Sequence, residues 1–534
     1  MPTHRPAKPA LPAMRGVRAA LALAPAMVLA ASLWAPARAQ QTELPAGFQD
    51  EVVADSLDQP LAIRFLPDGR IILIERVTAR VRVVVNGEAA TACTVPGVDG
   101  DTPEEGLLGL EIDPGWPDRP YVYLQFTAVA GPVVIARFTA AGDLTGEGDG
   151  LLTIDPATRR DVLVVPNVRV IHNGGTLRFG PDGKLYSTQG EDGFNCESQR
   201  LESLLGKILR LDVSTVPPGP GGAPPLASLA PADNPFAAHP DARARLVWTL
   251  GMRNPYGLDI DPVDGGLLIA DVGAGEREEV SWAPVAGMNF GWPHWEGTRP
   301  HITCPGVDPS LFTPPLFEYD HDDSLDRGEA VIGIAVYRAP PFATRPFPAE
   351  YEGNHFFTDH FTGWIRRVQR SGTSWIVAPP VAGQRNAETW SYGYGRMTSG
   401  AVGPDGSLYY VQAFSDDRFF EPSGVIRRIV RSGPLDVRGP ASPGLSLEPP
   451  RPVPSRGHVV LAYSLEVAGP VELALYDAAG RRVRLLVHDP MPAGRREVRW
   501  DGRDDRGRPA PAGVYFARLV AGDRSAGRRF PLVR

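Results

Sequence analysis

One short phrase recurs six times between residues 65 and 414 and constrains the fold more than any other feature. Each copy places a turn rich in Pro, Asp and Gly between two apolar segments. The copies are "FLPDGRIILIE" (65–75), "LEIDPGWPDRPYVYLQF" (110–126), "LRFGPDGKLYSTQG" (177–190), "LDIDPVDGGLLIADVG" (258–273), "FPAEYEGNHFFTDH" (347–360) and "AVGPDGSLYYVQAF" (401–414). Pro fixes φ at the first corner, Asp bonds to its own backbone and Gly adopts φ > 0, so the phrase predicts β-hairpins.

Six ordered hairpins predict an all-β chain in which residues 40–431 form a six-bladed β-propeller. The copies stand roughly 45 to 90 residues apart, more than four short strands need, so long loops should separate the strands. Helix should be scarce, with one short helix over residues 201–207 that ends at Gly206. A β-sandwich with similar turns is the alternative fold.

The repeat ends near Val430, and a second unit follows it. Residues 432–455 contain seven prolines, which predicts a stiff linker over 432–445. Six short alternating strands then predict a small immunoglobulin-like β-sandwich over 446–534. This unit contains 16 Arg against 10 Asp or Glu, so attachment to an anionic cell surface is possible through it.

The first 39 residues have the pattern of a secretory signal peptide. Four basic residues precede the apolar segment 19–34, and "ARA" (37–39) offers small residues for cleavage near Ala39. The apolar segment is short for a membrane span. We therefore expect a secreted, periplasmic or cell-surface protein.

The number of cysteines and the net charge limit which disulfides and which partners can be expected. In an oxidising compartment Cys93, Cys196 and Cys304 allow at most one internal disulfide, and the sequence leaves the pairing open. The formal net charge is −8 although residues 446–534 are basic, so the body of the chain is strongly acidic. Such a body would repel nucleic acid, and we expect no nucleic-acid partner.

His172 is the first candidate catalytic residue. It follows a β-branched segment and precedes Asn173-Gly174-Gly175, whose glycines allow a flat ligand to approach the backbone. Glu191 stands at the end of the partner strand and could hold one ring nitrogen while the other faces the channel. This arrangement suits a general base. The alternative is a histidine that caps a strand end beside a solvated turn.

Three further groups of residues are candidates for the same site. Arg253 and Asn254 precede a proline between two strands, where a guanidinium would stabilise an oxyanion, or would merely connect blades. Trp292 and Trp295 could form walls for a planar ligand or pack in the core. The acidic residues of 271–279 suit a hard cation such as Ca²⁺, or form a solvated loop; they are Asp271, Glu276, Glu278 and Glu279.

Several motifs together resemble a known family. "EEGLLGLEIDP", "HNGGTLRFGPDGKLY", "LLGKILRLDV", "GMRNPYGLDIDP", "DVGAGEREEV" and "NFGWPHWEG" follow one another in the order found in the soluble quinoprotein sugar dehydrogenases of the glucose/sorbosone dehydrogenase type. Those proteins are six-bladed propellers that use pyrroloquinoline quinone and calcium, and the resemblance covers about residues 45–430. The tail motif "WDGRDDRGRPAPAGVYFARL" resembles the immunoglobulin-like domain of the flagellar hook-capping protein.

The resemblance implies specific roles for the candidate residues. His172 would take the proton of a sugar C1 hydroxyl while hydride passes to the quinone, Glu191 would orient His172, and Arg253 would contact the quinone. Further cofactor contacts would come from Glu104, Asn254 and Arg366, and backbone carbonyls of the calcium loop from Gly273 and Ala274.

This chain also departs from the family pattern at identifiable positions. Family members pair the carboxylates of the cofactor with a lysine, whereas Thr362 stands in the corresponding segment here. The mature chain contains only Lys184 and Lys207, neither of which matches that lysine. Arg338, Arg366 and Arg396 are the candidate substitutes. Glu104 replaces the glutamine and Glu191 the aspartate that are common in the family.

The leading hypothesis is an exported quinone-dependent aldose dehydrogenase that oxidises a small sugar and passes electrons to a soluble acceptor. A non-catalytic carbohydrate- or protein-binding propeller is the alternative, for which the absent lysine is the discriminating feature. A metal-dependent lactonase-like hydrolase on the same architecture would instead need side-chain carboxylates around its metal.

Overall fold

The computed structural model describes residues 42–533 except for a few short segments: 130, 170, 309–310, 323, 325–326, 341–342, 415–421, 433–444, 452–456, 466, 478–481 and 522–523. The predicted signal peptide and nearly all of the predicted linker lie outside the described residues. Strands dominate the described part of the chain, as predicted. Its helices are all too short or too polar to span a bilayer.

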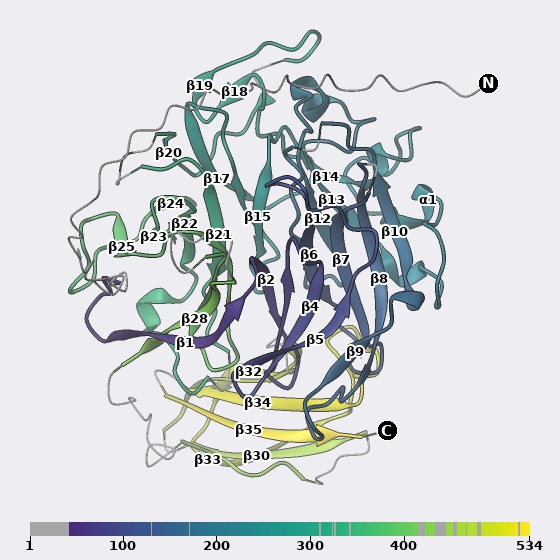
Figure 1. Cartoon of the computed structure of the whole chain (residues 1–534). Coiled ribbons are helices and arrows are strands. Elements are labelled where there is room, and N and C mark those ends of the chain that lie inside the picture. Colours follow the sequence, from purple (N-terminus) through teal and green to yellow (C-terminus); the bar gives the residue numbers. More distant parts are fainter. Residues whose placement is uncertain are drawn as a thin grey trace, which may run out of the picture. The chain divides into compact units, whose positions relative to one another are not determined.

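The described residues before 432 form six antiparallel sheets, which follow one another along the chain (Figure 1). The first contains β2 (Pro60–Phe65), β3 (Ile71–Glu75), β4 (Arg80–Val85) and β5 (Glu88–Thr94). The second contains β6 (Leu107–Ile112), β7 (Tyr121–Thr127), β8 (Val133–Gly142), β9 (Leu152–Ile154) and β10 (Arg160–Val165). The third contains β11 (Leu177–Phe179), β12 (Leu185–Gln189), β13 (Lys207–Leu211) and β14 (Val247–Leu250).

The later sheets repeat this plan. The fourth contains β15 (Pro255–Ile260), β16 (Leu267–Asp271), β17 (Arg277–Ala283) and β20 (Phe317–Asp320). The fifth contains β21 (Val331–Val336), β22 (His355–Asp359), β23 (Trp364–Ser371), β24 (Ser374–Val377) and β25 (Thr389–Tyr392). The sixth contains β26 (Met397–Val402), β27 (Leu408–Gln412), β28 (Gly424–Arg431) and β1 (Phe48–Leu57). A separate small hairpin joins β18 (Trp295–Glu296) to β19 (Arg299–Pro300).

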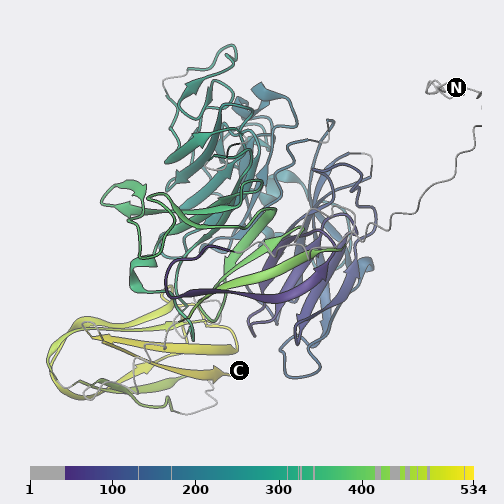
Figure 2. The same cartoon turned by 60° about the vertical axis from the view of Figure 1, so that its left-hand side comes forward.

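The recurring phrase marks one place in this plan. All six copies lie between the first and second strands of a sheet, so the hairpin prediction is confirmed at each. The first strands β2, β6, β11, β15, β21 and β26 contact one another in succession, and β26 contacts β2. Figures 1 and 2 show β1, in purple, beside β28, in green, so the last sheet is completed by the start of the described chain. The first strands therefore surround a common centre.

The predicted helix over 201–207 is wrong. A 3-10 turn occupies Asn195–Gln199 instead, and β13 begins at Lys207. Gly206 has φ +66° and donates its N–H to the carbonyl of Gly190, which turns the chain directly into the strand. The one α-helix among the described residues is α1 (Leu226–Leu229). The remaining 3-10 turns are Pro156–Thr158, Val213–Thr215, Ala244–Leu246 and Ala349–Tyr351.

The described residues from 445 onward form two further antiparallel sheets. One contains β29 (Leu445–Leu447), β30 (Val459–Leu465) and β33 (Gly494–Trp500). The other contains β31 (Gly469–Tyr476), β32 (Arg482–Met491), β34 (Gly513–Ala521) and β35 (Arg524–Leu532). Both sheets contribute to one core around Trp500 that draws on residues 445–532 alone. The six strands predicted here from alternation are confirmed.

Candidate active site

A cavity of about 790 Å³ lies where the first strands begin. Every first strand contributes a lining residue at or just before its start; these are Leu61, Leu108, Gly174, Tyr256, Ile332 and Thr398. Loops that connect neighbouring strands supply the polar lining. Because strand starts from six sheets meet here, residues far apart in the sequence share one wall.

His172 lines this cavity and is held through both ring nitrogens. Its Nδ1 lies 2.6 Å from Oε1 of Glu191, whose side chain is fully buried. Its Nε2 lies 2.9 Å from Nη2 of Arg253. A guanidinium can only donate, so Nε2 accepts and Nδ1–H donates to the carboxylate. This tautomer places the basic lone pair of His172 on Nε2.

The backbone at His172 explains the neighbouring glycines. His172 has φ +52°, a left-handed conformation that is uncommon for any residue but glycine. A Cβ at Gly190 would lie 1.8 Å from the carbonyl oxygen of His172, and a Cβ at Gly174 would lie 2.6 Å from that of Thr188. Both positions therefore require glycine for close approach of two chain segments.

Glu104 and Asn254 also line the cavity and bind this segment. Glu104 Oε2 accepts the N–H of His172 at 2.6 Å, and Asn254 Oδ1 accepts the N–H of Gly174 at 3.1 Å. Glu104 thus gives the His172 N–H a carboxylate acceptor. Charge-assisted hydrogen bonds of this kind are stronger than neutral ones.

Asp271 binds the backbone of the Arg253–Asn254 segment. Its carboxylate accepts the N–H of Arg253 at 3.0 Å and the N–H of Asn254 at 2.7 Å. Burial raises the pKa of Asp271 to about 7, although both N–H bonds and the Arg253 charge oppose the rise. Arg253 also donates through Nη1 to the carbonyl of Val272 at 2.9 Å. The guanidinium is therefore fixed between His172 and the loop that follows β16.

Gly273 and Ala274 line the cavity, but the acidic residues around them do not form a cation site. Glu276 pairs with Arg299 at 2.9 Å on the surface. Asp271, Glu278 and Glu279 are buried and accept backbone N–H groups. Within the described ranges, no three His, Cys, Asp or Glu side chains gather as a metal site would require. The expectation of a carboxylate cation site in 271–279 is wrong, because the buried carboxylates already accept hydrogen bonds from backbone N–H groups and Glu276 pairs with Arg299.

The structure does not bring Arg366 to the cavity, which corrects its expected cofactor role. Arg366 lies on β23, the third strand of its sheet, whereas first strands and their loops line the cavity. Its guanidinium lies 4.2 Å from the ring centre of Trp364 and 3.7 Å from Glu388. Arg338 is bound to Asp261. Of the three candidate arginines, Arg396 lines the cavity.

Neither lysine of the described residues reaches the cavity. Lys184 pairs with Asp212, in a turn of the third sheet. Lys207 is fully buried, and its Nζ donates to the carbonyls of three residues, Glu197, Ser198 and Leu205. Burial lowers the pKa of Lys207 to about 7. The structure also places Thr362 outside the lining, where its hydroxyl donates to the carbonyl of Arg327.

The two tryptophans expected as ligand walls also lie outside the lining. Trp292 is buried, and its ring stacks on His301 with centres 5.0 Å apart.

One disulfide joins Cys196 to Cys304, while Cys93 is a buried free thiol. The bond connects the loop that follows Glu191 to the segment after β19, 108 residues away.

Two histidines of the lining were missed by the sequence reasoning. His321 Nδ1 lies 2.6 Å from Oε1 of buried Glu278, and this hydrogen bond raises the pKa of His321. His360 donates Nδ1–H to the carbonyl of Met397, and burial lowers its pKa. Each stands directly after a strand. A search for histidines directly after predicted strands could therefore have found both, whereas His172 itself lies in the loop between β10 and β11.

Comparisons with known proteins show which family the chain resembles. The family profile described as glucose/sorbosone dehydrogenase matches residues 57–320, and that of the FlgD Ig-like domain matches residues 458–525. The aldose sugar dehydrogenase YliI of Escherichia coli is 28% identical over 354 residues, which cover 65% of this chain and 81% of that protein. Quinoprotein glucose dehydrogenase B of Acinetobacter calcoaceticus is 27% identical over 285 residues, covering 47% of this chain and 54% of its own length.

Solved structures extend the likeness to the fold. An oxidoreductase described as a glucose dehydrogenase from Thermus thermophilus superposes with a TM-score of 0.55 at 29% identity, covering 72% of this chain and 100% of its own. The pyrroloquinoline quinone-bound aldose sugar dehydrogenase of Streptomyces coelicolor gives 0.52 at 26% identity, with coverage of 72% and 99%. Residues 57–320 therefore match the glucose/sorbosone dehydrogenase family, and residues 458–525 match the FlgD Ig-like domain.

Proposed function

We propose that this protein is an exported quinoprotein that oxidises the C1 hydroxyl of an aldose and transfers the hydride to pyrroloquinoline quinone. One observation carries the proposal: His172 is held by Glu191 and Arg253 at the wall of the cavity, and all three residues lie within the family match at 57–320. An imidazole with a buried carboxylate on one nitrogen is suited to removing a hydroxyl proton.

His172 would act through Nε2. The proton of the C1 hydroxyl moves to Nε2, and Glu191 stabilises the imidazolium through Nδ1–H. Pyrroloquinoline quinone, when bound, would supply the acceptor for the hydride of C1. The aldose would then leave as a lactone, and His172 would pass its proton to water. In the structure Arg253 donates a hydrogen bond to Nε2 of His172, so the substrate hydroxyl must displace the guanidinium from that nitrogen. The released guanidinium can then neutralise negative charge in the cavity.

The lining residues fit a flat, tricarboxylate cofactor. Three arginines line the cavity, namely Arg76, Arg253 and Arg396, and they can balance carboxylate charge without a lysine. Arg76 already donates to the carbonyls of Thr102 and Glu105, which fixes its position. Arg253, Arg396 and Asn254 would hold the cofactor, Arg76 would add a fixed positive charge, and Glu104 would hold the backbone of His172.

Calcium would bind through the backbone at Gly273 and Ala274. Carbonyl oxygens are hard ligands of the kind Ca²⁺ prefers. Two carbonyls are too few for an ion that takes about six to eight oxygens, so cofactor and water oxygens would complete its shell. The absence of a side-chain carboxylate cluster from the described residues is compatible with such a site.

The proposal includes the architecture and location. The six sheets would be the blades of a six-bladed β-propeller, supported by the succession of contacts among their first strands. The two sheets around Trp500 would be an immunoglobulin-like sandwich, supported by the FlgD Ig-like match. Residues 1–39 would direct export. The basic C-terminal unit would attach the protein to the cell surface, and a soluble acceptor would reoxidise the cofactor.

A binding propeller without catalysis is the second candidate. The observation that favours it is the position of Lys184 and Lys207, neither of which reaches the cavity. Without a lysine, arginines alone must recognise the cofactor carboxylates, and an Arg fork does not reproduce a Lys point charge. The hydrolase alternative gains no support, because it needs a carboxylate cluster that the described residues lack.

Reconstitution separates these functions. Purified full-length protein is incubated with pyrroloquinoline quinone and Ca²⁺, and dye reduction is followed with a panel of aldoses. We expect turnover with at least one aldose that depends on both additions. Protein that binds no quinone at micromolar concentration, or binds a sugar without reducing dye, would favour the binding propeller.

A further inference from the structure

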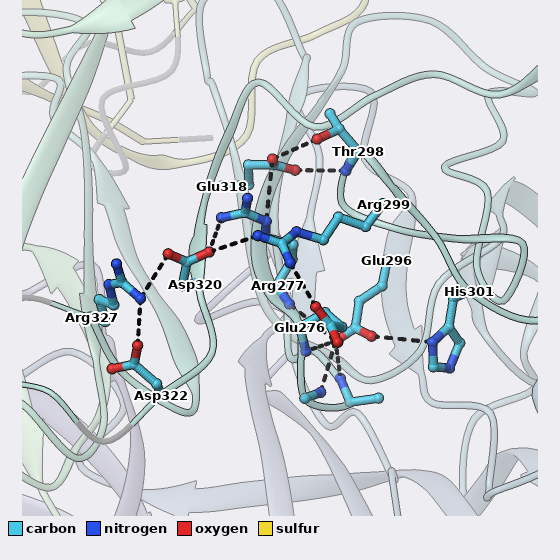
Figure 3. A network of polar contacts seen from close by, with 12 residues as sticks. Glu276, Arg277, Glu296, Thr298, Arg299, His301, Glu318, Asp320, Asp322 and Arg327 are labelled. Atoms are coloured by element: carbon cyan, nitrogen blue, oxygen red, sulfur yellow. Dashed lines mark hydrogen bonds and ion pairs between the residues drawn. The ribbon is translucent and has the colours of Figure 1, made fainter.

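Glu296 holds the loop after β16 through a single oxygen. Oε1 of this buried side chain accepts four consecutive backbone N–H groups, as the close-up in Figure 3 shows around Glu296. The donors are Ala274 at 2.7 Å, Gly275 and Glu276 at 2.8 Å, and Arg277 at 3.1 Å. Successive N–H groups that converge in this way form an anion-binding nest.

The nest fixes where the carbonyls of the loop point. In a planar trans peptide the C=O and the following N–H point in opposite directions. Since the N–H groups of Ala274 and Gly275 point at Glu296, the carbonyls of Gly273 and Ala274 point away from it. Both residues line the cavity, whereas Glu296 does not.

The preceding peptide gives independent evidence for this orientation. The N–H of Gly273 donates to buried Glu278 at 3.1 Å, so the carbonyl of Val272 must point the other way. That carbonyl accepts Nη1 of Arg253, a cavity-lining residue, at 2.9 Å. The side of the loop opposite the carboxylates is therefore the side that faces the cavity.

We propose that Glu296 is a positioning residue: its nest turns the carbonyls of Gly273 and Ala274 into the cavity, where they bind Ca²⁺. This inference rests on the proposed function, because the ion is the one expected beside the quinone. Four converging N–H donors make the Glu296 carboxylate a strong acceptor.

The test compares Glu296→Ala and Glu296→Gln with a matched control, Glu318→Gln. Glu318 belongs to the neighbouring polar network of Figure 3: it accepts from Thr298 at 2.7 Å and pairs with the Arg277 side chain at 3.5 Å, but it accepts none of the four nest N–H groups. Calcium binding to full-length protein is measured by isothermal titration calorimetry with quinone present. Hydrogen exchange of the amides of 274–277 is followed without quinone.

We expect Glu296→Ala to weaken calcium binding by about 10- to 100-fold, as loss of a residue that orients metal ligands does, and to speed exchange of the four amides. Glu296→Gln keeps the acceptor oxygen without its charge and should weaken binding less. Glu318→Gln should bind calcium like the wild type.

Two results would overturn the inference. One is a Glu296→Ala protein that binds calcium with wild-type affinity. If the alanine variant does not fold, the corresponding result is a Glu296→Gln protein that exchanges the four amides faster and still binds calcium with wild-type affinity. The other is wild-type protein that reduces dye with quinone yet binds no calcium. Failure of the proposed function is distinguishable, because it shows as wild-type protein that binds calcium but reduces no dye with any aldose.

Discussion

His172 combines a strained backbone with a fully engaged side chain. A non-glycine residue with φ +52° costs about 1 to 3 kcal/mol, which surrounding contacts must offset. Here Glu104 accepts the N–H, Glu191 and Arg253 bind the ring, and Gly190 packs against the carbonyl. The cost is consistent with a functional position, because the strain brings the imidazole to the cavity wall.

Replacing Gly190 tests this placement directly. A Cβ in Gly190→Ala would lie 1.8 Å from the His172 carbonyl oxygen, so the His172 segment must move. We expect a loss of about 1 to 3 kcal/mol in stability from overpacking. Misplacement by about 1 Å can reduce a rate by about 100-fold, so dye reduction should fall at least tenfold.

Melting curves and dye reduction per folded molecule are measured beside Gly222→Ala, whose added Cβ meets nothing within 4 Å. The control should retain the wild-type rate. A Gly190→Ala protein with an unchanged rate would show that the close approach does not position the imidazole.

At the scale of elements, the sequence predicts strands well and side-chain partners unevenly. The Pro/Asp/Gly phrase marked the connection between the first and second strands of all six sheets, because turns depend on local residues, but the connection between β21 and β22 is a long loop over residues 337–354. Arg366 was misassigned because period-2 alternation does not tell which strand of a sheet is innermost. His321 and His360 were missed because neither is followed by the Asn-Gly-Gly sequence that marked His172.

Strand β22 contains a buried group that makes stability depend on pH. His355 has no hydrogen-bond partner within the described residues for either ring nitrogen, and burial lowers its pKa from 6.5 to about 3. Between these values the unfolded chain binds a proton that the folded chain does not. Stability is therefore fully present above pH 6.5 and is lost as pH falls toward 3.

We expect His355→Phe to gain stability relative to the wild type as pH falls from about 7 to about 4, by at most about 1.4 kcal/mol per pH unit. Thermal melts at several pH values measure the difference. His488→Phe, at an exposed position, is the control and should give no such trend. A constant offset between His355→Phe and wild type at every pH would contradict the account.

At the scale of the molecule, two sets of sheets close separate cores. The core around Trp500 contains residues 445–532 alone, and the other clusters draw on residues 44–429. Pairing of β1 with β28 joins the two ends of the first set. Each set has what an independently folding domain needs, a core of its own.

Truncation after Pro440 should therefore leave residues 1–440 folded and competent. We expect the shortened protein to keep its melting transition and its dye-reduction rate after reconstitution, because neither the cavity nor the first-strand contacts involve residues beyond 440. Circular dichroism and dye reduction check this. A truncated protein that fails to fold would contradict the division at 432–445.

His172→Ala gives the most direct test of the central claim. Quinone-loaded wild-type and variant proteins are compared by dye reduction with the best aldose, and quinone affinity and melting temperature are measured on the same samples. We predict a rate lower by about 10²- to 10⁴-fold, the usual contribution of a general base, with quinone affinity and fold retained. An unchanged rate per folded molecule with a lower melting temperature would show that His172 is structural and would contradict the account.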